Sequence, residues 1–196
     1  MYPRGVPRRK KPIHSPIFAV GHSTRPIDEF VALLDANGIK QLIDIRTIPK
    51  SRYNPQFNGD TLAKSLRAAG IRYLHMKELG GLRRAKPDSI NLGWRNASFR
   101  GYADYMQTPE FAEALERAIK LAATRPTALM CAEAVPWRCH RSLVADALLV
   151  RGIAALEIIG PAKPKEHKLT SFARVRGTRI TYPADQRSLL DSSEET

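Results

Sequence analysis

The chain has 196 residues, of which 43% are hydrophobic and 26% charged, so it fits one globular domain with appended segments rather than a fibrous or wholly disordered protein. No apolar run approaches the ~18 residues of a membrane span, and two cysteines form no disulfide framework, which favours a cytoplasmic protein outside the membrane. The net charge of +13 favours polyanionic partners such as nucleic acid, anionic lipid or phosphorylated ligands, although a well-solvated surface explains it equally well.

Strands and helices are predicted to alternate along most of the chain. Short apolar runs indicate strands, and capping residues followed by apolar residues three or four positions apart indicate helices. In chain order, we expect a strand at 17–20, a helix from Pro26 to Asn37, a strand at 41–46, a helix that Asp60 caps and that runs to Ala69, a strand at 71–75, a helix that Thr108 caps, a strand at 127–132, a helix at about 138–151 and a strand at 154–159. This alternation predicts an α/β domain, Rossmann-like and three-layered, in which a mainly parallel sheet carries helices on both faces.

Both ends of the chain are predicted to be extensions of a single domain at 13–160. Residues 1–12 hold five cations and nothing to bury, so we expect a disordered basic arm. Residues 161–196 form a C-terminal extension with an acidic end, in which 172–182 could form a basic, exposed hairpin that turns at Gly177. Within the domain, the long connection between His75 and Gly101 is expected to be functional or mobile.

The densest group of reactive side chains lies where the strand at 127–132 ends and the next helix begins. Ligands collect at the carboxyl ends of parallel strands, and helix N-termini offer unpaired N–H groups to anions. We therefore expect a functional site there. Its catalytic candidates are Cys131, Glu133, Cys139 and His140, and its ligand-binding candidates are Arg138 and Arg141.

Several uses of this group are compatible with the sequence. A cysteine thiolate activated by neighbouring cations could be a nucleophile, but six residues separate Cys131 from Arg138, and the loop lacks the glycines of a tyrosine-phosphatase loop. The residue types also suit zinc, but Cys139 and His140 on one helix would point about 100° apart, so no metal ligands are predicted. Glu133 and the arginines could instead bind a polar ligand, or the two cysteines could form a redox pair. In a purely architectural alternative, Glu133 pairs with an arginine and His140 caps its helix.

Two other predicted strands should place polar side chains at the same edge of the sheet. His22 and Ser23 follow the first strand, and Asp44 and Arg46 end the second, where their side chains project to the same side. Asp44 and Arg46 could pair with each other or reach a ligand. His22 could act as an acid or base together with the carboxylate and imidazole of the later loop.

Tyrosines precede the predicted helix that begins at Thr108. Tyr102 and Tyr105 are three residues apart and could share a helix face as packing residues. With Trp94 and Phe99 they could instead stack on a planar ligand such as a base, so both tyrosines are ligand-binding candidates.

Taken together, these motifs resemble the DUF488 family of bacterial and archaeal proteins. The resemblance spans about residues 18–160 and is carried by His22, Ser23, Asp44, Arg46, Gly80, Gly81, Tyr102, Tyr105, Cys131, Glu133, Cys139, His140 and Arg141. It implies a compact α/β domain, but no activity, because the function of the family is undetermined. The basic arm and the C-terminal extension lie outside the shared pattern.

The sequence as a whole predicts an enzyme with a polar pocket at the strand carboxyl ends and an anionic substrate, such as a nucleotide or nucleic acid. Arg46, Arg138 and Arg141 would bind negative charge. Glu133, His22 or His140 would move protons, and a cysteine thiolate would be the nucleophile if the reaction uses one. One alternative is a non-catalytic nucleic-acid-binding module that uses the basic arm and tail. Another is a metal-dependent enzyme with cysteine, histidine and glutamate ligands.

Overall fold

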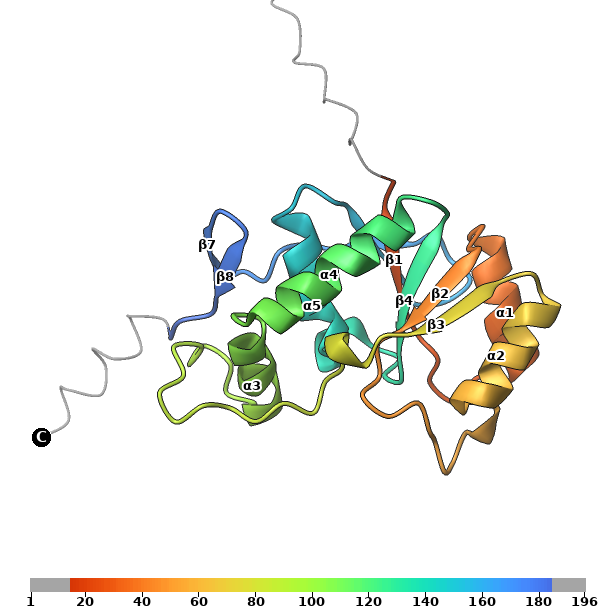
Figure 1. Ribbon diagram of the computed structural model, residues 1–196, viewed down its shortest axis with the longest axis horizontal. Coiled ribbons are helices and arrows are strands. Elements are labelled where there is room, and N and C mark those ends of the chain that lie inside the picture. Colours follow the sequence, from red (N-terminus) through yellow and green to blue (C-terminus); the bar gives the residue numbers. More distant parts are fainter. Residues whose placement is uncertain (1–14, 185–196) are drawn as a thin grey trace, which may run out of the picture.

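The protein has an α/β fold built on a mainly parallel six-stranded sheet (Figure 1). The structure is a computed structural model that describes residues 15–184, so the predicted arm at 1–12 and the acidic end lie outside the described residues. The strands are β1 (Ile17–Gly21), β2 (Gln41–Asp44), β3 (Arg72–His75), β4 (Thr127–Cys131), β5 (Ala155–Ile158) and β6 (Lys165–Glu166). They lie in the order β3-β2-β4-β1-β5-β6, all parallel to their neighbours except β6, which runs antiparallel to β5.

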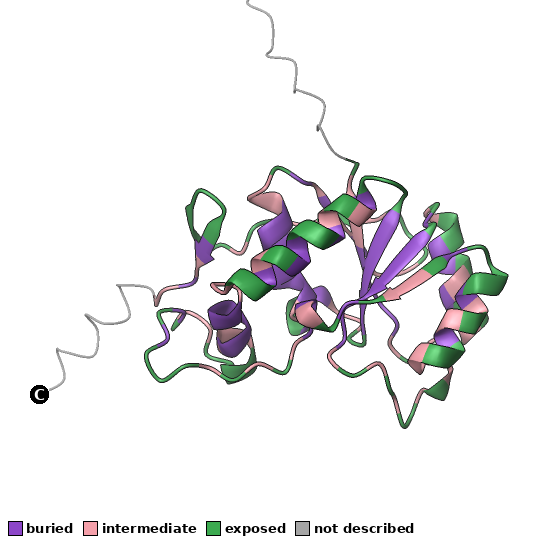
Figure 2. Cartoon of the chain, in the orientation of Figure 1, coloured by how far each residue is buried: buried purple, intermediate pink, exposed green. Residues whose placement is uncertain are grey.

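Helices cover both faces of this sheet, as predicted. The α-helices are α1 (Ile27–Ala36), α2 (Gly59–Ala68), α3 (Ala97–Tyr105), α4 (Pro109–Ala122) and α5 (Arg141–Leu149), and the short 3-10 helices are η1 (Pro55–Phe57), η2 (Lys77–Leu79) and η3 (Pro136–Arg138). One apolar core joins the sheet to α1 and α2, and the other joins its opposite face to α3, α4 and α5. Because both faces are covered, the central strands β2 and β4 are buried along their whole length (Figure 2).

Local signals position several helix ends where the sequence predicts them. Pro26 is the N-cap of α1, and Gly38 beyond its end has a φ of 66°, which glycine adopts without strain. The Thr108 hydroxyl accepts a hydrogen bond from the N–H of Phe111 at 3.3 Å, so it caps α4 as expected.

Two predicted helix starts are wrong. The N-cap of α2 is Asn58, and Asp60 lies inside the first turn, where its charge favours the helix dipole without capping. The helix predicted from about residue 138 begins only at Arg141, because Pro136 starts a separate 3-10 turn and Cys139 then adopts an extended conformation with φ −131° and ψ 140°. This correction decides how the reactive side chains are arranged.

The C-terminal segment packs more closely against the domain than its charge suggests. The predicted hairpin is present as β7 (Arg174–Arg176) and β8 (Arg179–Thr181), with Gly177 at φ 60° in its turn. All of β7 is exposed, as expected, but Tyr182 just after β8 is fully buried. Within residues 15–184, no helix has the length and apolar character needed to cross a membrane.

Candidate functional site

A cavity of about 870 Å³ opens beyond the carboxyl ends of β1, β2 and β4. In a parallel sheet this edge is the usual place for ligands, because the loops that follow neighbouring strands meet there. Nine of the twelve residues that the sequence predicts for the site line this cavity, namely His22, Ser23, Arg46, Tyr102, Cys131, Glu133, Arg138, Cys139 and His140. The other three, Asp44, Tyr105 and Arg141, do not reach its wall.

The three residues outside the cavity wall hold other parts of the protein in place. Asp44 is fully buried and binds Arg46. The Tyr105 hydroxyl donates to the carbonyl of Glu78 at 2.6 Å. The guanidinium of Arg141, also fully buried, donates to the carbonyl oxygens of the loop that follows β4. The expectation that these three side chains contact a ligand is therefore not met, because each is occupied by partners within the protein.

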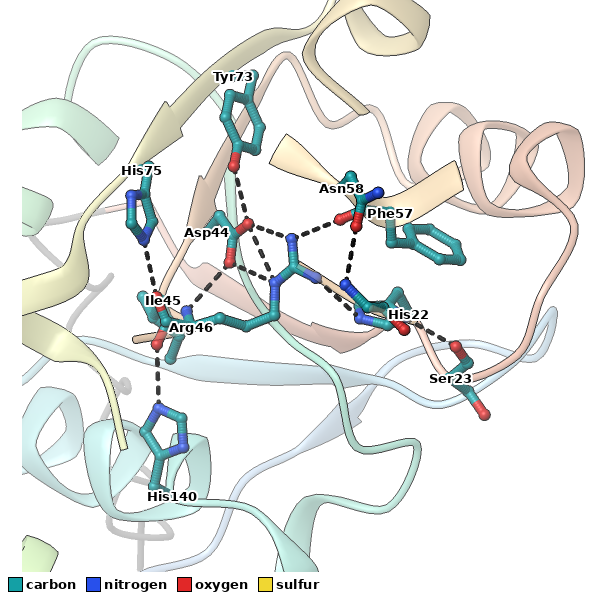
Figure 3. Close-up of polar contacts among 11 residues, drawn as sticks. His22, Ser23, Asp44, Ile45, Arg46, Phe57, Asn58, Tyr73, His75 and His140 are labelled. Carbon is teal, nitrogen blue, oxygen red and sulfur yellow. Dashed lines mark hydrogen bonds and ion pairs between the residues drawn. The ribbon is translucent and has the colours of Figure 1, made fainter. Parts of the chain in front are cut away.

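A buried ion pair fixes the side chain of Arg46 (Figure 3). Arg46 Nε lies 2.9 Å from Asp44 Oδ1, and its Nη2 lies 2.5 Å from Oδ2 and also donates to the carbonyl of Phe57. The Tyr73 hydroxyl donates to Asp44 Oδ2 at 2.8 Å. The alternation of side chains along an extended segment predicted that the two project to the same side and left pairing and ligand binding as alternatives, of which the structure shows the pairing. Because its charge is neutralised, Arg46 contributes less attraction for an anion than a free arginine would.

His22 is held as a neutral ring on the cavity wall. Its Nδ1 lies 2.7 Å from the carbonyl oxygen of Ser23 and so carries the proton, which leaves Nε2 to accept from Arg46 Nη1 at 3.3 Å. The ring stacks on Phe57 with a centroid distance of 4.1 Å. Burial lowers the pKa of His22 to about 4. With both nitrogens engaged, His22 positions its neighbours and is poorly suited to transfer protons.

Cys131, Cys139 and His140 form the reactive cluster of the cavity. His140 Nε2 lies 3.2 Å from the carbonyl oxygen of Ile45, so Nε2 carries the proton and the Nδ1 lone pair points away from that carbonyl (Figure 3). Nδ1 lies 3.8 Å from Cys131 Sγ and 3.8 Å from Cys139 Sγ. His140 is the N-cap residue of α5, as the architectural alternative expected, but its side chain makes no capping hydrogen bond to the helix.

Backbone conformation brings this cluster together. Cys131 is the last residue of β4, and the extended Cys139 lies between η3 and α5, so Cys139 and His140 do not diverge as they would on one helix. Gly21 at the end of β1 makes room for the intervening loop, since a Cβ there would lie 1.8 Å from the carbonyl oxygen of Glu133. A continuous helix through position 139, as expected from the sequence, would have kept Cys139 and His140 from binding one ion, and the break at Cys139 removes that obstacle.

The two thiols differ in their protonation. A hydrogen bond from Cys131, ahead of the opposing effect of burial, lowers the pKa of Cys139. Donating that hydrogen bond, together with burial, raises the pKa of Cys131. Cys139 is therefore the first of the two to become a thiolate, and a thiolate can attack an electrophile or bind a metal.

Exposed charges surround the cluster. Lys50, Glu133 and Arg138 line the cavity and are exposed to solvent. Within residues 15–184, the Glu133 carboxylate forms no ion pair; Arg141 binds the Glu133 carbonyl instead, so that part of the architectural alternative is wrong. These exposed groups can bind the charged parts of a ligand without first breaking a buried interaction.

A second polar network, which was not expected from the sequence, ties the C-terminal segment to α5. Asp146 accepts from His167 Nε2 at 2.9 Å and from the Tyr182 hydroxyl at 2.8 Å. Glu157 lies 3.5 Å from His167 Nδ1 and 3.5 Å from Arg141 Nε. The available signal was an acidic residue inside an apolar helix and another inside a core strand, because buried charges require partners. Through Arg141 this network also supports the loop that lines the cavity.

Comparison with known proteins identifies one family. The family described as "Domain of unknown function DUF488" matches residues 26–148, which include all the cavity-lining residues except His22, Ser23 and Thr24. No curated protein and no solved structure matches the chain.

Proposed function

Because the chain belongs to the DUF488 family, whose function is unknown, we propose a function from its cavity: an enzyme that acts on an anionic substrate of the nucleotide class. The reactive centre in this proposal is the cluster of Cys131, Cys139 and His140. The observation that carries the proposal is that this cluster and two exposed cations open onto the same cavity.

Substrate binding in this proposal uses groups that need no rearrangement. Lys50 and Arg138 are exposed on the cavity wall and bind the phosphate. Phe99, which is partly exposed, also lines the cavity and offers aromatic surface to a base, whereas Tyr102 is buried and packs behind His140. A volume of about 870 Å³ is large enough for a nucleotide, since ligand pockets usually measure about 300–1,000 Å³.

In this proposal the substrate binds so that its electrophilic atom lies next to Cys131, Cys139 and His140, and the reaction takes place at that atom. Glu133 accepts the proton released in the reaction, because its exposed carboxylate has no ion-pair partner in the described part of the chain. His22 and Arg46 hold the wall through their mutual hydrogen bond and take no part in proton transfer.

Protection of the thiols by a nucleotide tests this proposal. The alkylation rates of Cys131 and Cys139 by iodoacetamide are measured by mass spectrometry on EDTA-treated protein, with and without AMP at constant ionic strength. AMP is expected to slow alkylation at both sites in the parent protein. The double variant Lys50→Ala/Arg138→Ala is expected to lose this protection.

The matched control removes two exposed cations elsewhere. Lys163 and Lys168 are exposed and do not line the cavity, so Lys163→Ala/Lys168→Ala should keep the protection that AMP provides. Equal alkylation rates with and without AMP would refute the nucleotide class of substrate. Protection lost equally in both double variants would show a general charge effect and would refute the role of Lys50 and Arg138.

A second candidate, binding of nucleic acid without catalysis, is favoured by the exposed cations of the C-terminal hairpin. Arg174, Arg176 and Arg179 are all exposed there. On duplex DNA, the logarithm of the affinity falls by about 0.9 per log unit of salt for each phosphate that the protein neutralises. Deleting residues 1–12 and, separately, replacing the three arginines by alanine should flatten this salt dependence. Salt dependence unchanged by both alterations would argue against this candidate.

A further inference from the structure

The donor atoms of the cluster are spaced like the ligands of one metal ion. His140 Nδ1 lies 3.8 Å from each sulfur, and the three atoms of Cys131, Cys139 and His140 all lie within 4.8 Å of one another. Zinc binds sulfur at about 2.3 Å and nitrogen at about 2.0–2.1 Å, so in a tetrahedral site such atoms are about 3.5–3.8 Å apart. Small side-chain movements are enough to place all three around one ion.

The imidazole is already oriented as a ligand. Its Nε2–H donates to the carbonyl oxygen of Ile45 at 3.2 Å, which leaves the lone pair on Nδ1, the atom that faces the sulfurs. Histidines that bind metals usually donate their other ring N–H to a carbonyl or carboxylate in this way. Gly81 makes this position available, since a Cβ at residue 81 would lie 2.9 Å from His140 Nδ1. The ring of Tyr102, 4.8 Å away between centroids, packs against the imidazole.

We propose that Cys131, Cys139 and His140 bind one divalent ion of the zinc class, with a fourth position open to the cavity. Two thiols and an imidazole are soft and borderline donors, which suit zinc or ferrous iron and not magnesium or calcium. Three protein ligands with an open position are typical of catalytic zinc sites, whereas structural sites use four. All three residues line the cavity, so a ligand in the fourth position would meet the substrate.

Binding of the ion replaces the two thiol protons, which pass to solvent. The two thiolates then neutralise the 2+ charge. A water in the fourth position would be acidified by the ion and could transfer its proton to the exposed Glu133 carboxylate. The role of the ion as a cofactor rests on the proposed function of this cavity. Binding of the ion itself requires only the three ligands and no particular substrate.

Cobalt(II) provides a spectroscopic test on the full-length chain. EDTA-treated, reduced protein is titrated anaerobically with Co²⁺, and the thiolate-to-cobalt charge-transfer absorption and the visible bands of tetrahedral cobalt are recorded. We expect one Co²⁺ per chain and complete displacement by Zn²⁺. Cys131→Ser, Cys139→Ser and His140→Ala should each weaken binding by more than the roughly 10–100-fold that follows from losing a residue hydrogen-bonded to a metal ligand.

The matched control is His22→Gln, which removes the other imidazole of the same cavity and should keep the cobalt spectrum. Because a ligand variant could fail to fold, X-ray absorption of the zinc-loaded parent protein provides a second measurement, with two sulfur ligands and one imidazole nitrogen expected. Absence of stoichiometric binding, or a zinc ion bound without sulfur, would overturn the inference. AMP protection is measured on ion-free protein, so failure of the metal site and failure of the proposed substrate class are distinguished.

Discussion

Replacing His167 tests the buried network that joins the C-terminal segment to α5. His167 lies between two acidic groups, with Nε2 2.9 Å from Asp146 and Nδ1 3.5 Å from Glu157, while Arg141 and the Tyr182 hydroxyl contact the same carboxylates. Burial opposes the charge on His167, but its hydrogen bonds to the two carboxylates raise its pKa from 6.5 to about 9. The imidazole is therefore charged in the folded protein at neutral pH.

The pKa of His167 predicts the pH at which this network weakens. Because the pKa is raised in the folded state, the stabilisation is fully present below pH 6.5 and is lost as the pH rises through about 9. At about 1.4 kcal/mol per pKa unit, the difference corresponds to about 3 kcal/mol of unfolding free energy. The variant His167→Gln has no imidazole to titrate. Between pH 6.5 and about 9 it should therefore lose about 3 kcal/mol less unfolding free energy than the parent protein.

Urea unfolding followed by circular dichroism, at a series of pH values from about 6 to about 10, measures this effect. The parent protein should lose stability across the series, and His167→Gln should lose about 3 kcal/mol less. His75→Gln, which removes an exposed histidine on β3, is the matched control and should keep the parent slope. Parallel pH profiles for the parent protein and His167→Gln would refute the reasoning.

Three further predictions concern residues on or directly behind the cavity wall. Gly21→Ala should destabilise the protein by at least about 2 kcal/mol in urea unfolding, because the added Cβ would clash with the Glu133 carbonyl. The control Gly160→Ala should cost little, because no atom lies within 4 Å of the Cβ added there. Asp44→Asn should cost about 3 kcal/mol in the same assay, since it leaves the Arg46 guanidinium buried with a neutral partner; a cost near zero would contradict the buried ion pair. The parent protein should lose stability as the pH falls from 6.5 towards 4, because His22 binds a proton more readily in the unfolded chain than in the folded protein. His22→Gln should not show this loss, and an acid profile equal to that of the parent would count against this account.

The parts of the site that local rules govern were predictable from the sequence. Side chains two residues apart on an extended segment share a side, and Asp44 indeed binds Arg46. Strand ends in a parallel sheet meet at one edge, and His22, Arg46 and Cys131 indeed line one cavity. The first result depends only on the local backbone, and the second depends only on the expectation that the strands are parallel.

The metal-like spacing of the cluster was not predictable, because it depends on a break in a predicted helix. Proline at 136 starts a 3-10 turn, and the extended Cys139 then turns its sulfur towards Cys131. The carbonyl of Ile45, 95 positions away along the chain, orients the His140 ring. The spacing of apolar residues within one segment carries no information about a hydrogen bond to a residue so distant in the sequence.

The amino-acid sequence alone determined most of the alternation of strands and helices and the positions of most of their ends, because these follow from interactions within a few residues. The same alternation indicated a parallel sheet, and with it the edge at which polar groups gather. Tertiary structure decided the rest. It decided which candidates face the cavity and which, like Arg141 against Glu157, are buried in an ion pair. The physical reason is that a charged side chain takes its role from the partners that surround it after folding, and those partners come from distant parts of the chain.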